Sequence, residues 1–195
     1  MLLPALNSAI VFGRDHLFLR GTGAGQPLGV INAPRTITVA NDTGQAASSI
    51  VYENIVTMHS RLHPQCLGRA VWIANPTALP QLLQLSVPVG TGGSHVPVLN
   101  ETAGTYSILG RPLLLTSKLP ALGTRGDLML VDRSQYVIGE SPGIVVASSD
   151  HHKVLQGQRV WLAFTRIDGQ PKWAAPYTPQ HGDSLSWAVT LDTRA

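Results

Sequence analysis

The sequence lacks several features that would narrow its function. It has one cysteine, Cys66, which excludes a disulfide framework within the chain and any zinc site built from several cysteines. Charged residues make up 13% of the chain, with 14 Lys or Arg against 11 Asp or Glu, so the net charge is only +3. This excess is too small for a dedicated nucleic-acid surface. An apolar content of 44% excludes a disordered chain.

Long apolar runs are also missing. No stretch approaches the roughly 20 apolar residues that a membrane helix needs, so no membrane partner is expected. The segment from Met1 to Asn7 has no basic residue and is interrupted by Pro4. We therefore expect no signal peptide and a reducing compartment.

The low charge content fits two kinds of protein. One has a large core under an ordinary surface of Ser, Thr, Asn and Gln. The other is a subunit whose surface is mostly covered by copies of itself. Composition alone does not distinguish them.

Apolar spacing predicts two helices in the first third of the chain. The first starts at the N-terminus without a capping residue and is expected to end at Gly13. Because it begins so abruptly, we expect the chain to lack an N-terminal part of its fold. The second spans 45–63, with Asp42 or Thr43 as its cap and Pro64 as its end. Its apolar stripe, at helical spacing, consists of Ala47, Val51, Ile55, Met58 and Leu62.

A short strand is expected at 36–39, and the continuously apolar segment 70–74 predicts a strand buried on both faces. Asn75 followed by Pro76 predicts the start of a short or kinked helix, with Asn75 as its cap. Three leucines of this helix are expected to face the core: Leu79, Leu82 and Leu83.

The remainder of the chain has a β pattern. Strands are expected at 106–109, 112–116, 128–131, 135–138, 143–148, 153–167 and 185–191. Asp168 and Gly169 predict a hairpin turn, and a Gly-rich loop around 90–93 is expected to be mobile. Because helices come first and strands later, the order favours an α+β fold over a doubly wound α/β fold.

The glycine-rich segment Gly21–Gly25 has part of the pattern of a dinucleotide-binding loop. The third glycine of that pattern is missing, because Gln26 stands in its place, and Pro27 follows where the helix should run. We therefore expect a tight structural turn with no cofactor.

The histidines provide one pattern compatible with a metal site. His59 and His63 are four residues apart, as two ligands on one helix face would be, and Cys66 follows. However, no Glu follows His59, and Pro64 separates Cys66 from the helix. A position at the edge of the core is the preferred interpretation of both histidines.

The adjacent His151 and His152, beside Asp150, are interpreted as solvated side chains, because neighbours in a strand point to opposite faces. No catalytic, cofactor-binding or metal-binding residue is assigned. The chain is therefore not expected to be an enzyme.

Seven segments follow one another in a distinctive order and spacing over roughly residues 5–191. They are Gly21–Ile31 with its glycine-rich turn, Ala70–Pro76, Ile108–Leu113, Gly126–Asp132, Gln135–Ile138, Arg166–Gly169 and Leu185–Val189. Together they resemble the major capsid proteins of tailed bacteriophages, the family with the Hong Kong 97-type fold.

The resemblance implies a two-lobed α+β subunit, truncated at its N-terminus. Residues 1–35 and 141–195 would form a peripheral lobe, and 36–140 an axial lobe. Copies would assemble into hexamers and pentamers of an icosahedral head. Packaged DNA would be touched only non-specifically, with scaffold or portal proteins as further partners. The protein would lie in the host cytoplasm before assembly and then in the virion of a phage or prophage.

The family's N-terminal arm and extended loop, which clasp neighbouring subunits, have no counterpart in the sequence. We therefore expect the chain to fold but, at micromolar concentration, to be monomeric or to form small rings, and not to close shells alone. Three alternatives remain open: a nanocompartment shell protein of the same fold, a small metal-dependent hydrolase using His59, His63 and a distant ligand, and a binding module without catalysis.

Overall fold

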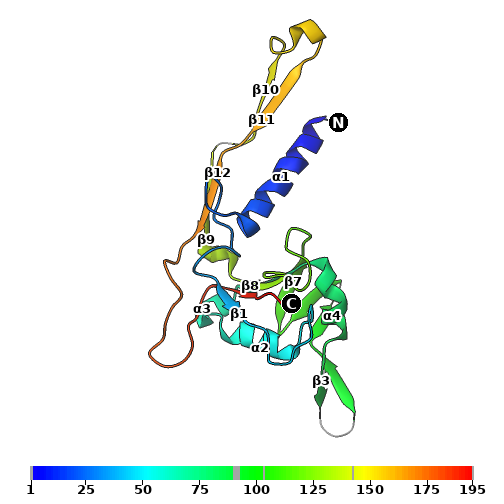
Figure 1. Ribbon diagram of the computed structural model, residues 1–195, viewed down its shortest axis with the longest axis vertical. Helices are drawn as coiled ribbons and strands as arrows, with labels where there is room; N and C mark the ends of the chain where they lie inside the picture. The colour runs from blue at the N-terminus through cyan, green and yellow to red at the C-terminus, as the bar shows by residue number, and fades with distance from the viewer. Residues whose placement is uncertain (1, 90–92, 103, 142, 195) are drawn as a thin grey trace.

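The computed structural model describes residues 2–89, 93–102, 104–141 and 143–194 (Figure 1). Its centre is a mixed sheet with the strand order β1-β13-β8-β2-β7-β6-β5. These strands are β1 (Ile37–Val39), β2 (Val71–Ala74), β5 (Leu99–Thr102), β6 (Thr105–Ile108), β7 (Arg111–Leu115), β8 (Leu128–Val131) and β13 (Ala188–Leu191). β1 runs parallel to β13 and β2 parallel to β7, whereas the other neighbours are antiparallel.

The middle of this sheet is buried on both faces. Every residue of β2, β8 and β13 is buried, which is why these segments are continuously apolar or small instead of alternating. The strands predicted at 36–39, 70–74 and 128–131 are confirmed, and so is the α+β class.

Helix α2 (Tyr52–Ser60) packs against β13 and β1. Ile55 and Met58 are fully buried, and Leu62, just beyond the helix, is 2% exposed, so this part of the predicted apolar stripe is confirmed. Its other two members precede the helix: Ala47 is exposed and Val51 is half-buried, so their predicted place on the helix is wrong. The predicted start at residue 45 is wrong. The Gln45 side chain donates to Asn54 Oδ1 and to the Ser49 carbonyl, both at 2.8 Å. These bonds hold the preceding segment as turns, and Asp42 does not cap the helix.

Two short helical segments flank β2. Helix α3 (Pro64–Leu67) precedes it, and a 3-10 turn, η1 (Pro76–Ala78), leads from it into α4 (Leu79–Gln84). Asn75 caps η1 as predicted, because its Oδ1 accepts the Thr77 N–H at 2.9 Å. Leu82 is 1% exposed, but Leu83 is 52% exposed, so its predicted core position is wrong. A helix this short buries only a narrow face.

Three two-stranded units lie outside the sheet. The valine hairpin consists of β3 (Ser86–Val89) and β4 (Ser94–Pro97). The proximal ribbon pairs β9 (Tyr136–Glu140) with β12 (Ile167–Pro171), and the distal hairpin pairs β10 (Val145–Ser149) with β11 (Val160–Phe164). Short turns η2 (Arg133–Gln135) and η3 (Val154–Gln156) complete the set. In Figure 1 the ribbon and distal hairpin extend from one end of the sheet beside α1 (Leu2–Arg20), and the valine hairpin projects at the other end.

Further sequence predictions need correction in this region. Helix α1 does not stop at Gly13 but continues to Arg20. Asp168 and Gly169 form no hairpin turn; they lie inside β12, opposite Gly139 and Ile138. The single strand expected at 153–167 is instead a turn followed by β11 and the start of β12. The loop expected to be mobile falls mainly on 90–92, outside the described residues.

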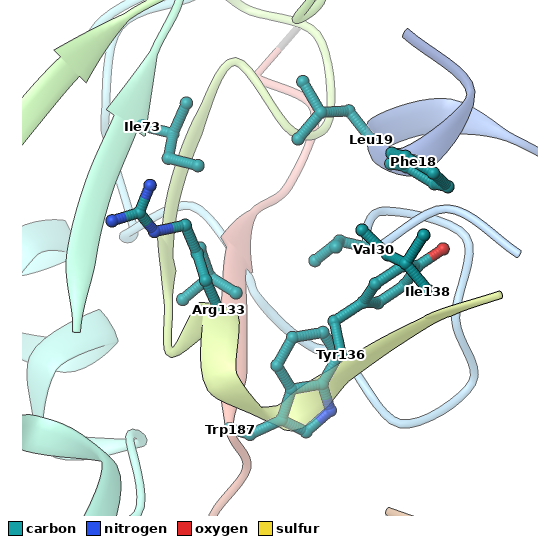
Figure 2. A pocket seen from close by; sticks show the side chains of 9 residues that line it. Phe18, Leu19, Val30, Ile73, Arg133, Tyr136, Ile138 and Trp187 are labelled. Atoms are coloured by element: carbon teal, nitrogen blue, oxygen red, sulfur yellow. The ribbon is translucent and has the colours of Figure 1, made fainter. Parts of the chain in front are cut away.

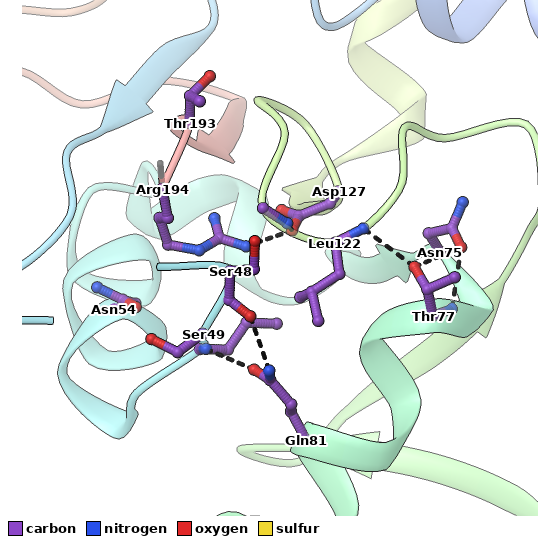
Figure 3. A network of polar contacts seen from close by, with 12 residues as sticks. Ser48, Ser49, Asn54, Asn75, Thr77, Gln81, Leu122, Asp127, Thr193 and Arg194 are labelled. Carbon is purple, nitrogen blue, oxygen red and sulfur yellow. Dashed lines mark hydrogen bonds and ion pairs between the residues drawn. The ribbon is translucent and has the colours of Figure 1, made fainter. Parts of the chain in front are cut away.

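The C-terminal segment is fastened to the body through a buried ion pair. Arg194, 1% exposed, binds the carboxylate of Asp127, which is fully buried (Figure 3). The Arg194 carbonyl accepts the Ser48 N–H at 2.9 Å, and the Gln81 side chain donates to the Ser48 carbonyl at 2.7 Å. β13, which precedes this segment, pairs with β1 and β8 in the main sheet, although it lies in the range expected for the peripheral lobe. The lobe boundaries themselves stay a prediction.

Candidate assembly surfaces

The residues considered for metal binding do not converge. Within the part of the chain that the structure describes, no three His, Cys, Asp or Glu side chains lie close enough to share an ion. His63 instead caps α3, where its Nδ1 accepts the Gln65 N–H at 3.3 Å. Its ring packs edge-on against Trp173 and Tyr177, with centroids 5.3 and 5.5 Å away. His63 therefore lies at the edge of the core, as the sequence predicted.

Cys66 is buried, with 1% of its surface exposed. Burial, with the nearby Asp132 carboxylate as a second cause, raises the pKa of its thiol to about 11. A thiolate is the reactive form of cysteine, so this side chain is a poor nucleophile at neutral pH.

His151 and His152 are exposed, as expected, but they lie in the turn at the tip of the distal hairpin and not in a strand. Beside them, Asp150 forms an ion pair with Arg159 across the hairpin, at 2.5 Å. This pair closes the tip and leaves the two histidines in solvent.

The glycine-rich turn is structural. A Cβ on Gly21 would lie 2.1 Å from the Pro27 carbonyl oxygen, and one on Gly29 would lie 2.4 Å from the Gly21 nitrogen. The backbone of the turn approaches itself too closely for any side chain at these positions. The prediction of a tight structural turn is confirmed.

The sequence also contains, at residues 139–143, the pattern Gly-x-Ser-x-Gly that is typical of nucleophile elbows. Such an elbow needs a strand, a sharp turn and then a helix. Here Gly139 lies in β9, the Ser141 N–H donates to the Arg166 carbonyl at 2.9 Å, and the next element is strand β10. The serine is therefore not presented as a nucleophile.

Helix α1 is held between the body and the proximal ribbon by two adjacent residues of opposite charge. Arg14 pairs with Glu140 of β9 at 2.7 Å, and Asp15 pairs with Lys118 of the body at 2.6 Å. Most of the helix is otherwise partly or fully exposed, including Phe12 at 53%. The helix is thus positioned along the side of the molecule and is not enclosed in its core.

The end of α1, the proximal ribbon and the sheet meet around a cavity of about 190 Å³ (Figure 2). Phe18 of α1 packs edge-on against Tyr136 of β9, with ring centroids 5.9 Å apart, and Tyr136 lies 6.4 Å from Trp187. The Tyr136 hydroxyl donates to the Leu28 carbonyl at 2.9 Å. Aromatic packing therefore joins the projecting elements to the body.

The distal hairpin has an unusual combination of composition and exposure. Its strands are mostly apolar, yet seven of their ten residues are exposed and the other three are only half-buried. Trp161 is 47% exposed, Leu162 57% and Phe164 43%. Because side chains alternate between the two faces of a strand, Leu162 and Phe164 lie on one face and Trp161 on the other. Apolar residues thus occupy both faces, a distribution typical of protein contact surfaces.

Sequence reasoning predicted a strand at 143–148 and placed β11 inside one long strand at 153–167, but it missed that the two form an exposed surface. The run from Val160 to Phe164 is as apolar as a strand from the centre of a sheet. Local sequence does not show that, among the described residues, β10 alone pairs with it. The valine hairpin was missed altogether, because Pro88 and Pro97 weaken the strand signal.

No helix in the described residues has both the length and the apolarity needed to cross a bilayer.

Comparisons with known proteins agree with this architecture. Residues 2–177 match the phage capsid family. No curated protein matches the sequence. Two solved structures similar to this chain are the capsids of the empty and the native GTA particle, with TM-scores of 0.70 and 0.71 at 16% and 14% identity. Both matches cover 100% of this chain and 65% of the GTA chain.

A third similar structure is the holo-SrpI encapsulin complex from Synechococcus elongatus PCC 7942. Its TM-score is 0.60 at 13% identity, covering 96% of this chain and 63% of that one. These likenesses show that the fold is the Hong Kong 97-type capsid fold, as the resemblance implied. Since the family match extends over most of its length, the chain belongs to the phage capsid family.

Proposed function

We propose that this chain is a structural shell protein, not an enzyme, and that copies of it assemble into the icosahedral head of a phage or prophage. The distal hairpin carries the proposal. Its apolar side chains are exposed on both faces, and an isolated two-stranded hairpin is at best marginally stable in water. Contact with neighbouring copies would cover these side chains. Family membership and the capsid fold support the same function.

The finer parts of the proposal follow the family. Copies would form hexamers and pentamers, touch packaged DNA without sequence preference, and meet scaffold or portal proteins. The protein would lie in the host cytoplasm before assembly and in the virion afterwards. We assign α1, the proximal ribbon and the distal hairpin to the peripheral lobe. The main sheet, β13 included, with α2, α4 and the valine hairpin would form the axial lobe.

The experiment compares the protein with two charge variants by mass photometry and electron microscopy over a range of concentrations. Leu162→Asp places a charge on the apolar distal hairpin. Gln170→Asp, the control, places the same charge on an exposed polar position of the adjoining proximal ribbon. At high concentration we expect rings from the unaltered protein and from Gln170→Asp, and smaller species from Leu162→Asp. A protein that stays monomeric at every concentration would contradict the proposal.

The second candidate is a nanocompartment shell protein, favoured by the similarity to the SrpI encapsulin complex. Particles isolated from the native host distinguish the two functions. Nuclease-protected DNA inside them supports a phage head, whereas a co-purifying protein cargo without DNA supports a nanocompartment.

A further inference from the structure

The cavity between α1, the proximal ribbon and the main sheet is lined almost entirely by apolar side chains. It measures about 190 Å³, and of the nine described residues that line it, eight are aliphatic or aromatic. Three of them carry aromatic rings: Phe18, Tyr136 and Trp187. Apolar cavities of about 150 Å³ in other proteins bind benzene, so this cavity has room for an aromatic ring.

The cavity has an exposed side and a buried side. Ile138 is 52% exposed and Arg133 is exposed, so these two residues lie at its mouth. Val131 and Trp187, at most 2% exposed, close its inner side. An apolar interior with a few polar groups that orient a ligand is the usual build of a small-molecule site.

Arg133 is the one charged residue among the described residues that line the cavity, and its charge is not neutralised there. Its guanidinium forms no ion pair or hydrogen bond with any described residue, and in Figure 2 it lies on the Ile73 side of the cavity. The preceding residue, Asp132, is instead paired with Arg69 at 3.3 Å.

A second carboxylate near the mouth is also paired elsewhere. Arg133 lines an adjoining hollow of about 410 Å³ together with Asp15 and Lys118. Asp15 pairs with Lys118 at 2.6 Å, so the two charges of that hollow cancel each other. The Arg133 guanidinium therefore remains available to an anion, and guanidinium groups bind carboxylates through two parallel hydrogen bonds.

We propose that this cavity binds a small aromatic carboxylate. The ring of the ligand lies among Phe18, Tyr136 and Trp187, where edge-to-face contacts are available, and its carboxylate pairs with Arg133 at the mouth. A neutral apolar molecule leaves the guanidinium without a partner, and an amine is repelled by it. Charge therefore distinguishes this class of ligand from others that the apolar lining alone would accept.

Such a ligand contacts three elements at once. Phe18 and Leu19 belong to α1, Tyr136 and Ile138 to β9, and Trp187 directly precedes β13. Binding therefore holds the helix and the proximal ribbon against the body and stabilises the folded protein. The residues of a single copy supply this lining, so the inference goes beyond the proposed function and does not depend on it.

The test uses a phenylbutanoate that carries fluorine on its ring, followed by fluorine NMR with the full chain. The corresponding alcohol and amine are compared with it at the same concentrations. We expect a Kd of about 1 mM or below for the carboxylate, as for other ligands of this size. The alcohol and the amine should bind at least about tenfold more weakly, because they lack the charged hydrogen bonds to Arg133.

Two pairs of variants locate the site. Arg133→Gln removes the charge at the mouth, and its control, Arg20→Gln, removes the same charge from an exposed position outside the lining. Ile138→Trp fills the cavity, and its control, Val137→Trp, places the same side chain on the opposite face of β9. All four positions are exposed, so thermal unfolding without the probe should stay close to that of the unaltered protein.

We expect Arg133→Gln to weaken binding of the carboxylate about tenfold, Ile138→Trp to abolish it, and both controls to leave it within about twofold. An alcohol that binds as tightly as the carboxylate, or carboxylate binding that survives Arg133→Gln, would overturn the proposed ligand class. Unchanged binding to Ile138→Trp would place the probe elsewhere on the protein. Displacement of the probe when the protein self-associates would mean that a second copy fills the cavity, and no binding to the unaltered protein would overturn the site itself.

Discussion

Two strands of nearly equal apolarity differ sharply in solvent exposure in this molecule. β8 in the main sheet reads Leu-Met-Leu-Val, and its residues are 0–2% exposed. β11 in the distal hairpin reads Val-Trp-Leu-Ala-Phe, yet Trp161, Leu162 and Phe164 are 43–57% exposed. β8 has β13 on one side and β2 on the other, with further residues packed over both faces. Among the described residues, β11 pairs with β10 alone.

The difference shows that an apolar strand sequence predicts burial of its side chains but not whether the same chain or another molecule buries them. In the main sheet, other parts of the same chain bury the apolar side chains. In the distal hairpin these side chains stay exposed, and under the proposed function neighbouring copies bury them. The predictions below separate the two regions by making matched changes in each, and they run from the largest expected effect to the smallest.

The first comparison replaces a tryptophan in each region by alanine. Trp72 in β2 is fully buried, and its Nε1 donates to the Ile108 carbonyl at 3.1 Å. Trp72→Ala should lower the free energy of unfolding by about 3–5 kcal/mol, because it leaves a cavity and an unpaired carbonyl. Trp161→Ala should lower it by less than about 1 kcal/mol, measured for both by urea unfolding of the monomer.

Trp161→Ala should nevertheless weaken self-association in mass photometry, which Trp72 cannot affect directly because it is buried. If both variants unfold with equal loss of stability, the distal hairpin is already packed within the monomer. The distinction between the two regions would then be wrong.

The second comparison concerns ion pairs. Asp127 and Arg194 are both buried, so Asp127→Asn should lower the free energy of unfolding by about 3–5 kcal/mol by leaving a buried guanidinium unpaired. Joint replacement of Arg194 by Met should recover much of that loss. Asp150 and Arg159 at the distal tip are exposed, and Asp150→Asn should give no measurable change. Equal losses of unfolding free energy at the two sites, measured by chemical denaturation, would mean that the ion pair at the tip is as shielded from water as the buried pair.

The third comparison uses neighbouring residues of α2. Ile55→Ala should lower the free energy of unfolding by about 2–4 kcal/mol, because Ile55 is fully buried against the sheet. Val56→Ala should change it by less than about 1 kcal/mol, because Val56 is 42% exposed. Both are measured by urea unfolding. Similar losses for the two variants would contradict the helix face that the spacing and the structure agree on.

Those elements of the fold that depend on local pattern could be predicted from the sequence. The apolar run of β2 and the Asn75 cap follow from residues close together in the chain. The start of α2 could not be predicted, because the Gln45 side chain bonds to Asn54 and so competes with helix formation. The prediction of a hairpin turn at Asp168 and Gly169 was wrong because of a contact distant in sequence. Pairing with Gly139 and Ile138 holds both residues in β12.

The candidate surfaces were less accessible to sequence reasoning than the fold. Strand apolarity was visible at 143–148 and 160–164, but exposure depends on which strands pair, and pairing is set by distant segments. His59, His63 and Cys66 have a spacing compatible with a metal site, but in the described residues they form no group of three possible ligands. The sequence does show one property of the region that contains the valine hairpin. No Asp, Glu, Lys or Arg lies between Ala70 and Asn100.

The smallest expected effect lies at the joint between the two regions. Tyr136 is half-buried between Phe18 and Trp187, and its hydroxyl donates to the Leu28 carbonyl at 2.9 Å. Tyr136→Phe removes this hydrogen bond and should lower the free energy of unfolding at pH 7 by about 1 kcal/mol. Tyr177→Phe, on an exposed tyrosine, is the control and should cause no change.

The pH dependence sharpens this test. Burial, and secondarily the Asp168 carboxylate, raises the pKa of Tyr136 to about 12 from an ordinary value of 10. A group whose pKa is raised by folding contributes stability below its unfolded pKa and loses it as the pH rises toward its folded pKa. The unaltered protein should therefore lose stability between about pH 10 and 12 through Tyr136, and Cys66, whose pKa is raised from 9 to about 11, adds a loss between about pH 9 and 11. In urea unfolding across this range, Tyr136→Phe should show a shallower decline than Tyr177→Phe. Parallel declines would mean that the Tyr136 hydroxyl ionises as freely in the folded protein as in the unfolded chain, and that the joint between body and ribbon is open to water.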